Sequence, residues 1–168
     1  GSNCLNLELF KSSTLMIILT GYKIQEKLYE SNRSLIYRGQ RNSDDLPIIL
    51  KVLKQQYPTP EMIDRFKLEY QITRSLNLPG TVQAYSLEKY NHSFVMVLED
   101  FGAISLQKII HNSDFNFSLQ KKLILAIKVT EILAQIHNNS IIHKDINPSN
   151  IVVNLQTEEL KIIDFVIS

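Results

Sequence analysis

Two polar side chains with complementary chemistry lie close together between His143 and Asn150, a stretch that reads His-Lys-Asp-Ile-Asn-Pro-Ser-Asn between two apolar runs. The carboxylate of Asp145 could accept a proton from an attacking hydroxyl, and the amide oxygen of Asn150 is a suitable ligand for Mg²⁺. Pro148 restricts the backbone of the loop that carries both. The stretch therefore indicates a site for a phosphate group and a metal ion, with a polar loop of no chemical role as the alternative.

A second pair of charged residues points to the same kind of site. Lys51 ends the apolar run Ile48–Lys51, and Glu69 follows it by 18 residues. The helix expected after Thr59 carries Glu69 inside an apolar stripe, where burial of a carboxylate is costly without a cation. We therefore expect an ion pair between Lys51 and Glu69, with a strand-edge lysine facing water as the alternative.

Hydrophobic periodicity supplies the elements that must position these residues. Strands are expected at residues 22–28, 35–38, 48–53, 82–87 and 94–98, followed by a hairpin of 151–154 and 160–163. Helices are expected at 60–76, 105–112 and 118–139, with Thr59 and Ser118 as N-caps. The last helix is predicted to bury the stripe Leu119, Leu123, Ala126, Ile127, Thr130, Leu133 and Ile136.

Composition narrows the class of protein. The chain has 168 residues, 44% of them hydrophobic, and a formal net charge of +1, so we expect a globular protein with no nucleic-acid partner. Cys4 is its single cysteine, which excludes an internal disulfide framework and fits the reducing cytosol, so a cytoplasmic location is expected. The apolar run at 15–19 is too short to span a membrane. Residues 1–20 are expected to be a loosely held extension or an extra strand, with a signal peptide as the alternative.

The motif from His143 to Asn150 resembles the catalytic loop of protein kinases, H-R-D-L-x-x-x-N. Five residues have the order and spacing of the kinase motifs: Lys51, Glu69, Asp145, Asn150 and Asp164. The resemblance implies an α+β fold with a five-stranded antiparallel N-lobe, helix C and the first part of a helical C-lobe. It divides the chain into an extension (1–20), an N-lobe (21–98), a hinge (99–102) and a partial C-lobe (103–168).

The same resemblance implies a reaction and its cofactors, ATP and Mg²⁺. Asp145 would position the acceptor hydroxyl, and Asn150 and Asp164 would hold Mg²⁺. Lys51 would contact the phosphates and Glu69 would fix Lys51. The nucleotide-binding residues implied are Lys51, Ser31, Ser34, Ile36, Leu98, Glu99 and Phe101, of which Leu98 would close the back of the adenine pocket.

Three departures from the kinase pattern keep other functions open. The three glycines of the phosphate-binding loop are replaced by Tyr29, Ser31 and Ser34, whose serine hydroxyls could donate hydrogen bonds instead. Asn147 replaces the catalytic-loop lysine, and Val166 replaces the glycine of the D-F-G motif. A pseudokinase that serves as a scaffold is therefore one alternative. A small-molecule phosphotransferase of the aminoglycoside or choline kinase type is the other.

Three segments of the sequence are also similar to the kinase-like domain that begins large bacterial multidomain sensor kinases. They are Ser34–Gly39, Ile49–Lys54 and His143–Ile151. That similarity implies a signalling role, with a protein substrate or downstream sensor and histidine kinase domains as partners. The last third of a usual kinase domain would follow Ser168. We therefore expect little phosphate transfer to protein by this chain itself, and apolar surface left uncovered on the helix at 118–139 and on the final hairpin.

Overall fold

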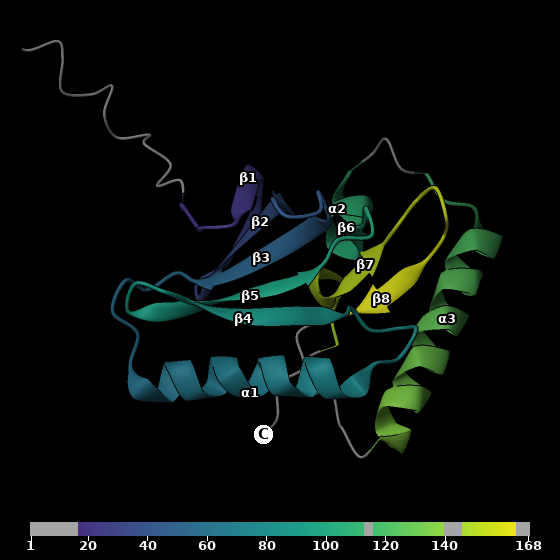
Figure 1. Cartoon of the computed structure of the whole chain (residues 1–168). Coiled ribbons are helices and arrows are strands. Elements are labelled where there is room, and N and C mark those ends of the chain that lie inside the picture. Colours follow the sequence, from purple (N-terminus) through teal and green to yellow (C-terminus); the bar gives the residue numbers. More distant parts are fainter. Residues whose placement is uncertain (1–16, 113–115, 140–145, 164–168) are drawn as a thin grey trace, which may run out of the picture.

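The computed structural model describes residues 17–112, 116–139 and 146–163. Within these ranges the first part of the chain forms a five-stranded antiparallel sheet in the order β1-β2-β3-β5-β4 (Figure 1). Its strands are β1 (Tyr22–Glu30), β2 (Ser34–Arg41), β3 (Pro47–Leu53), β4 (Ala84–Tyr90) and β5 (Ser93–Glu99). The predicted strands and the predicted antiparallel sheet are confirmed.

The two faces of this sheet carry different side chains. Lys51 is directly opposite Ile36 on β2 and Met96 on β5, so these three side chains share one face. The opposite face is a hydrophobic core built on Ile48, Leu50, Val52, Val95 and Val97. Ile17 and Leu19, from the end of the predicted extension, are buried in that core. Residues 17–19 are therefore held against the sheet.

Helix α1 (Pro60–Leu76) covers β4 and β5 on the face that bears Lys51 (Figure 1). It begins as predicted, because the Thr59 hydroxyl accepts a hydrogen bond from the Met62 amide and Pro60 occupies the first turn. Asn77 ends it in the left-handed conformation. The buried side chains of α1 are Phe66, Tyr70, Ile72, Thr73 and Leu76.

The later described residues form a smaller three-stranded sheet with helices beside it (Figure 1). Its elements are β6 (Ile104–Ser105), α2 (Leu106–His111), α3 (Leu119–Asn138), the short 3-10 helix Pro148–Asn150, β7 (Ile151–Val153) and β8 (Leu160–Ile162). Ile162 on β8 joins the two parts of the fold, since its amide donates to the Gly80 carbonyl at 2.9 Å. Gly80 also packs so tightly on Ile132 of α3 that an added Cβ would lie 2.4 Å from that side chain.

The predicted buried face of α3 is wrong for most of its length. Leu119, Leu123 and Ile127 are 73%, 55% and 58% exposed. Near its end the prediction is confirmed, because Ile136 is buried and Leu133 is partly buried in the same core. The helix also buries Leu125, which lies outside the predicted stripe, and it packs on β8. The physical reason is that α3 carries apolar residues on more than one face, so periodicity alone does not say which face meets the core. The uncovered apolar surface expected on this helix is present.

No helix among the described ranges is both long enough and apolar enough to cross a membrane.

Candidate active site

The predicted ion pair between β3 and α1 is confirmed. Lys51 Nζ donates to Glu69 Oε1 at 2.5 Å, and the two side chains are only 10% and 16% exposed. The β3 strand brings Lys51 to the face that α1 covers, and the helical period turns Glu69 towards the same face. At this burial each charge depends on the other, because an unpaired charge out of water is strongly destabilising.

An apolar surface lies beside Lys51 on the same sheet face. Ile36 is opposite Lys51, and Ile49 is opposite Leu98 on β5. Residues two positions apart on a strand share a face, so Ile36, Ile49 and Leu98 lie around the lysine. The sheet thus places one cation next to apolar side chains, an arrangement suited to a molecule that has both an anionic group and a flat apolar ring.

The turn between β1 and β2 is organised by Ser31. Its hydroxyl oxygen accepts hydrogen bonds from the amides of Ser34 at 2.9 Å and Arg33 at 3.2 Å. The Ser31 amide in turn donates to the Ser34 carbonyl at 2.9 Å. Two amides that could face a phosphate are therefore engaged within the turn.

The charges around this turn are partly balanced. Glu30 forms ion pairs with Lys54 at 2.7 Å and Lys27 at 3.0 Å. The hydrogen bond from Lys54, followed by that from Lys27, lowers the pKa of Glu30. Glu30 is thus a carboxylate at neutral pH and holds two cations beside the turn.

Asn147, which stands where kinases carry a lysine, has a structural role in the loop. Its side-chain oxygen accepts a hydrogen bond from the Ser149 amide at 2.9 Å and caps the short helix Pro148–Asn150. The Ser149 hydroxyl bonds the same oxygen. This cap fixes the backbone at Asn150, whose side chain is buried.

The predicted phosphate and metal residues fall partly outside the described ranges. Asp145 and Asp164 lie outside them, as do His143 and Val166. Asn150 is described, and its carbonyl accepts a hydrogen bond from the amide of Ile163 at 2.9 Å. Ile163 is the residue before Asp164 in the sequence, so the fold brings Asn150 to the end of the strand that leads to Asp164.

The predicted hinge is held by ion pairs that were not predicted from the sequence. Lys161 of β8 is buried, and its Nζ donates to Glu99 Oε1 at 2.8 Å. Arg38 of β2 donates through Nε to Asp100 Oδ2 at 2.8 Å and through a second nitrogen to the Ala103 carbonyl at 3.3 Å. Adjacent hinge carboxylates are thus each paired with a cation from a different sheet.

Backbone groups of the hinge are also fixed. The Asn154 side-chain amide donates to the Phe101 carbonyl at 2.7 Å, and the Gly102 amide donates to Asp100 Oδ1 at 2.9 Å. Gly102 has φ of 75°, a conformation that glycine adopts without strain. Two features of the sequence could have indicated the charged contacts of the hinge. One is Lys161 inside the apolar run Leu160–Ile163, and the other is the pair of adjacent carboxylates Glu99 and Asp100 at the end of an apolar strand.

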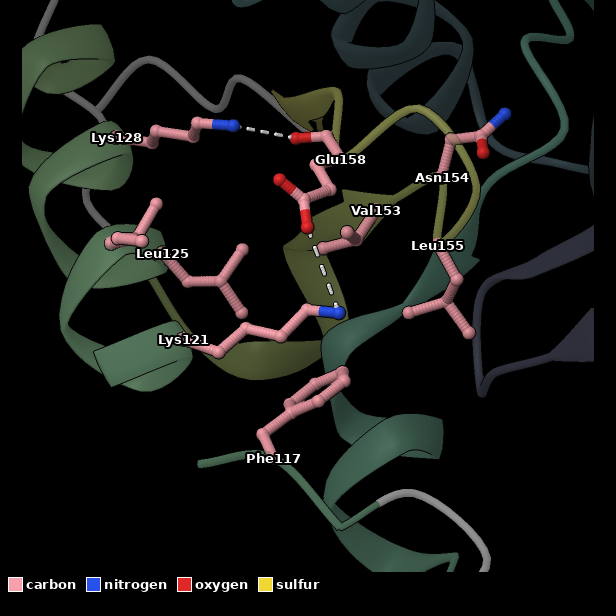
Figure 2. Close-up of a pocket in the computed structure, with 9 residues that line it drawn as sticks. Phe117, Lys121, Leu125, Lys128, Val153, Asn154, Leu155 and Glu158 are labelled. Carbon is pink, nitrogen blue, oxygen red and sulfur yellow. Dashed lines mark hydrogen bonds and ion pairs between the residues drawn. The ribbon is translucent and has the colours of Figure 1, made fainter. Parts of the chain in front are cut away.

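A separate small hollow lies between α3 and the turn after β7 (Figure 2). Lys128 and Lys121 line it, and both interact with Glu158, the former through the backbone carbonyl at 2.8 Å and the latter through the carboxylate at 3.7 Å. In Figure 2 the Asn154 side chain points away from Phe117 and out of the hollow. The lysines of the hollow are therefore engaged in joining helix and turn.

The described residues fit a nucleotide with its metal ion. Asn150 offers a buried amide oxygen, a hard ligand of the kind that Mg²⁺ takes, while Asp164, the second metal ligand predicted from the sequence, lies outside the described ranges. Lys51 supplies a cation for phosphate oxygens next to the apolar surface of Ile36 and Leu98. This donor set suits phosphate chemistry.

Comparison with known proteins agrees with this geometry. The model of the protein kinase domain family matches residues 22–168. The chain is 28% identical over 147 residues to serine/threonine-protein kinase PrkC of Bacillus subtilis, covering 86% of this chain and 22% of that protein. It is 27% identical over 143 residues to serine/threonine-protein kinase STY17 of Arabidopsis thaliana, covering 85% of this chain and 25% of that protein.

A third relative is serine/threonine-protein kinase PknL of Mycobacterium tuberculosis, which is 26% identical over 147 residues and of which 36% is covered. The chain thus spans between about a fifth and about a third of the length of these curated relatives.

Proposed function

This chain belongs to the protein kinase domain family, and from that premise we propose that it binds ATP with Mg²⁺ for transfer of the γ-phosphoryl group to a serine or threonine hydroxyl of a protein. The ion pair between Lys51 and Glu69 is the observation that carries the proposal, because it places a fixed cation beside an apolar surface. The names of the relatives support a protein acceptor over a small molecule.

Each site residue then has a proposed role. Lys51 binds phosphate oxygens and Glu69 holds it in place, while Asn150 and Asp164 hold the metal ion. Asp145 orients the acceptor hydroxyl and takes its proton. Mg²⁺, when bound, neutralises charge that develops on the phosphoryl oxygens.

Leu98 and Ile36 would contact the adenine ring of the nucleotide. The backbone of Glu99 to Phe101 would bind its polar edge. Ser31 and Ser34 would lie over the phosphates in place of glycines, with their hydroxyls as donors.

The domain division proposed is an extension at 1–20, an N-lobe at 21–98, a hinge at 99–102 and the first part of a C-lobe at 103–168. As partners we propose a protein substrate or the sensor and histidine kinase domains of a larger signalling protein. ATP-dependent phosphorylation requires a compartment that holds ATP, and we propose the cytoplasm.

The test is transfer of radiolabelled phosphate from ATP to a generic protein substrate, measured on this chain and on a longer polypeptide that includes it, with most of the label expected from the longer one. Asp145→Asn and Lys51→Met should each abolish the label, and acid hydrolysis should return phosphoserine or phosphothreonine. Label that persists in both variants, or that appears only on an aminoglycoside or choline, would refute the proposal.

One observation favours a scaffold without catalysis as the second candidate. The Ser31 hydroxyl engages two amides of the turn that covers the phosphates in kinases. A scaffold would bind its partner equally well with and without Mg-ATP, and Asp145→Asn would leave that binding unchanged.

A further inference from the structure

A buried lysine on β8 contacts the hinge twice. Lys161 has an 8% exposed side chain, and its Nζ lies 2.8 Å from Glu99 Oε1. The same ammonium group lies 4.9 Å from the centre of the Phe101 ring, within range of a cation–π interaction. A lysine is seldom buried unless it is paired, so these contacts explain its position between Leu160 and Ile162.

The Glu99 side chain is fixed from a second direction. Its Oε1 also accepts a hydrogen bond from the Gln83 amide at 3.1 Å, while the Glu99 amide donates to the Gln83 carbonyl at 2.9 Å. At the other end of the hinge, Asn154 holds the Phe101 carbonyl. The β7–β8 hairpin therefore fastens the hinge at two points, through Lys161 and Asn154.

This hairpin also leads to the residues proposed to bind the metal. Asn150 precedes β7, and the hydrogen bond from Ile163 to Asn150 closes the far end of β8. The β7–β8 hairpin thus connects the hinge, where the base of the nucleotide is proposed to bind, with Asn150, which is proposed to bind the metal ion. On the phosphate side, the turn between β1 and β2 has two of its amides engaged by Ser31.

We propose that Lys161 is a positioning residue for the base of the nucleotide. By holding Glu99 and Phe101 it fixes the hinge backbone in the orientation that receives the polar edge of the base, and it thereby sets the affinity for the nucleoside part of the ligand. The phosphates depend on Lys51 instead. This inference rests on the proposed function, because it concerns the same nucleotide site.

The experiment measures binding of two probes, adenosine and inorganic tripolyphosphate with Mg²⁺, by calorimetry on the 168-residue chain. Lys161→Met should weaken adenosine binding by about 10- to 100-fold, the loss typical of outer supporting residues, and leave tripolyphosphate unchanged. Lys51→Met should weaken the binding of tripolyphosphate and leave the binding of adenosine unchanged. Lys89→Met removes an exposed lysine from β4 of the same fold and should change neither.

Two further variants separate positioning from folding. The double variant Glu99→Gln with Lys161→Met removes both charges of the buried pair and leaves only Glu159, a half-exposed carboxylate 3.7 Å from Lys161 in the wild type. It should therefore unfold near the temperature of the wild type and still bind adenosine weakly. Lys161→Arg keeps the cation and should recover much of the affinity.

Three results would overturn the inference. Unchanged adenosine binding in Lys161→Met would show that Lys161 has no positioning role. Equal losses for both probes would show a general structural role. A wild-type chain that binds neither probe would refute the proposed function together with this inference.

Discussion

The pairing of Lys51 with Glu69 illustrates how burial turns a weak interaction into a strong constraint. An exposed ion pair contributes little to stability, since water screens both charges. Here both side chains are mostly removed from water and their charged atoms are 2.5 Å apart. Loss of one partner removes a close opposite charge from a group that stays mostly out of water, so the energetic effect of each residue depends on the presence of the other.

We predict that Glu69→Ala lowers the free energy of unfolding by about 3 to 5 kcal/mol, the usual cost of breaking a buried pair. Urea denaturation measures this. Glu61→Ala, at an exposed position in the first turn of the same helix, is the matched control and should cost far less. A loss below about 1 kcal/mol for Glu69→Ala would mean that the pair behaves as a surface pair.

A second prediction concerns Asp44, in the turn before β3. The hydrogen bond from Arg41 is the main cause that lowers the pKa of Asp44 from 3.8 to about 2. A lowered carboxyl pKa contributes stability above the pKa of the unfolded chain, and this contribution is lost as the pH falls from 3.8 through about 2. An NMR titration of the Asp44 carboxyl should show the low pKa in the wild type and a return towards 3.8 in Arg41→Gln. An equal pKa in both proteins would contradict the assigned cause.

At the scale of elements, the turn between β1 and β2 contains no glycine and is held in its conformation by hydrogen bonds to the Ser31 hydroxyl. We predict that Ser31→Ala lowers the free energy of unfolding by about 1 kcal/mol, because two amides of the turn lose their acceptor. Asn32→Ala, at the exposed neighbouring position, is the control and should have little effect. Equal stability of the Ser31 variant and the wild type, measured by urea denaturation, would show that water replaces the hydroxyl without cost.

The strands and helices could largely be predicted from the sequence, because their signals are local. Thr59 and Pro60 indicate the start of α1, and the alternation of apolar and polar residues predicts the strands. The pair of Lys51 and Glu69 could be predicted as well, since a carboxylate in an apolar stripe requires a cation.

Contacts between distant elements could not be predicted in the same way. The pairing of Lys161 with Glu99 joins residues 62 positions apart, and no periodicity links them. The buried face of the first part of α3 was predicted wrongly because two apolar faces satisfy the helical repeat there, and only packing against β8 decides between them. The position of Ile17 and Leu19 likewise depends on a core whose buried residues come from three strands, β2, β3 and β5.

At the scale of the whole molecule, the exposed apolar face of α3 is the main departure from an ordinary protein surface. Leu123 and Ile127 lie there with Ala126, Thr130 and Ala134. Contiguous apolar patches of this kind promote association.

We therefore predict that Leu123→Glu combined with Ile127→Lys preserves the fold and reduces self-association, because the new charges pair across one helical turn. Sedimentation velocity over a range of concentrations measures this. Ile110→Lys, at an exposed apolar position on α2, is the control and should leave self-association unchanged. A wild-type chain that stays monomeric at all concentrations would contradict the prediction.

We propose that this chain binds ATP through Lys51 and through the metal ion that Asn150 and Asp164 would hold, and the dissociation constant for ATP with and without Mg²⁺ tests this binding. The wild type should bind more tightly with Mg²⁺, Asp164→Ala should lose that difference, and Lys51→Met should bind weakly in both conditions. Ser31→Ala should keep the Mg²⁺ dependence, and Asp64→Ala, exposed on α1, should match the wild type. Equal affinity for ATP in every variant, with and without Mg²⁺, would refute the proposed binding of ATP by these residues.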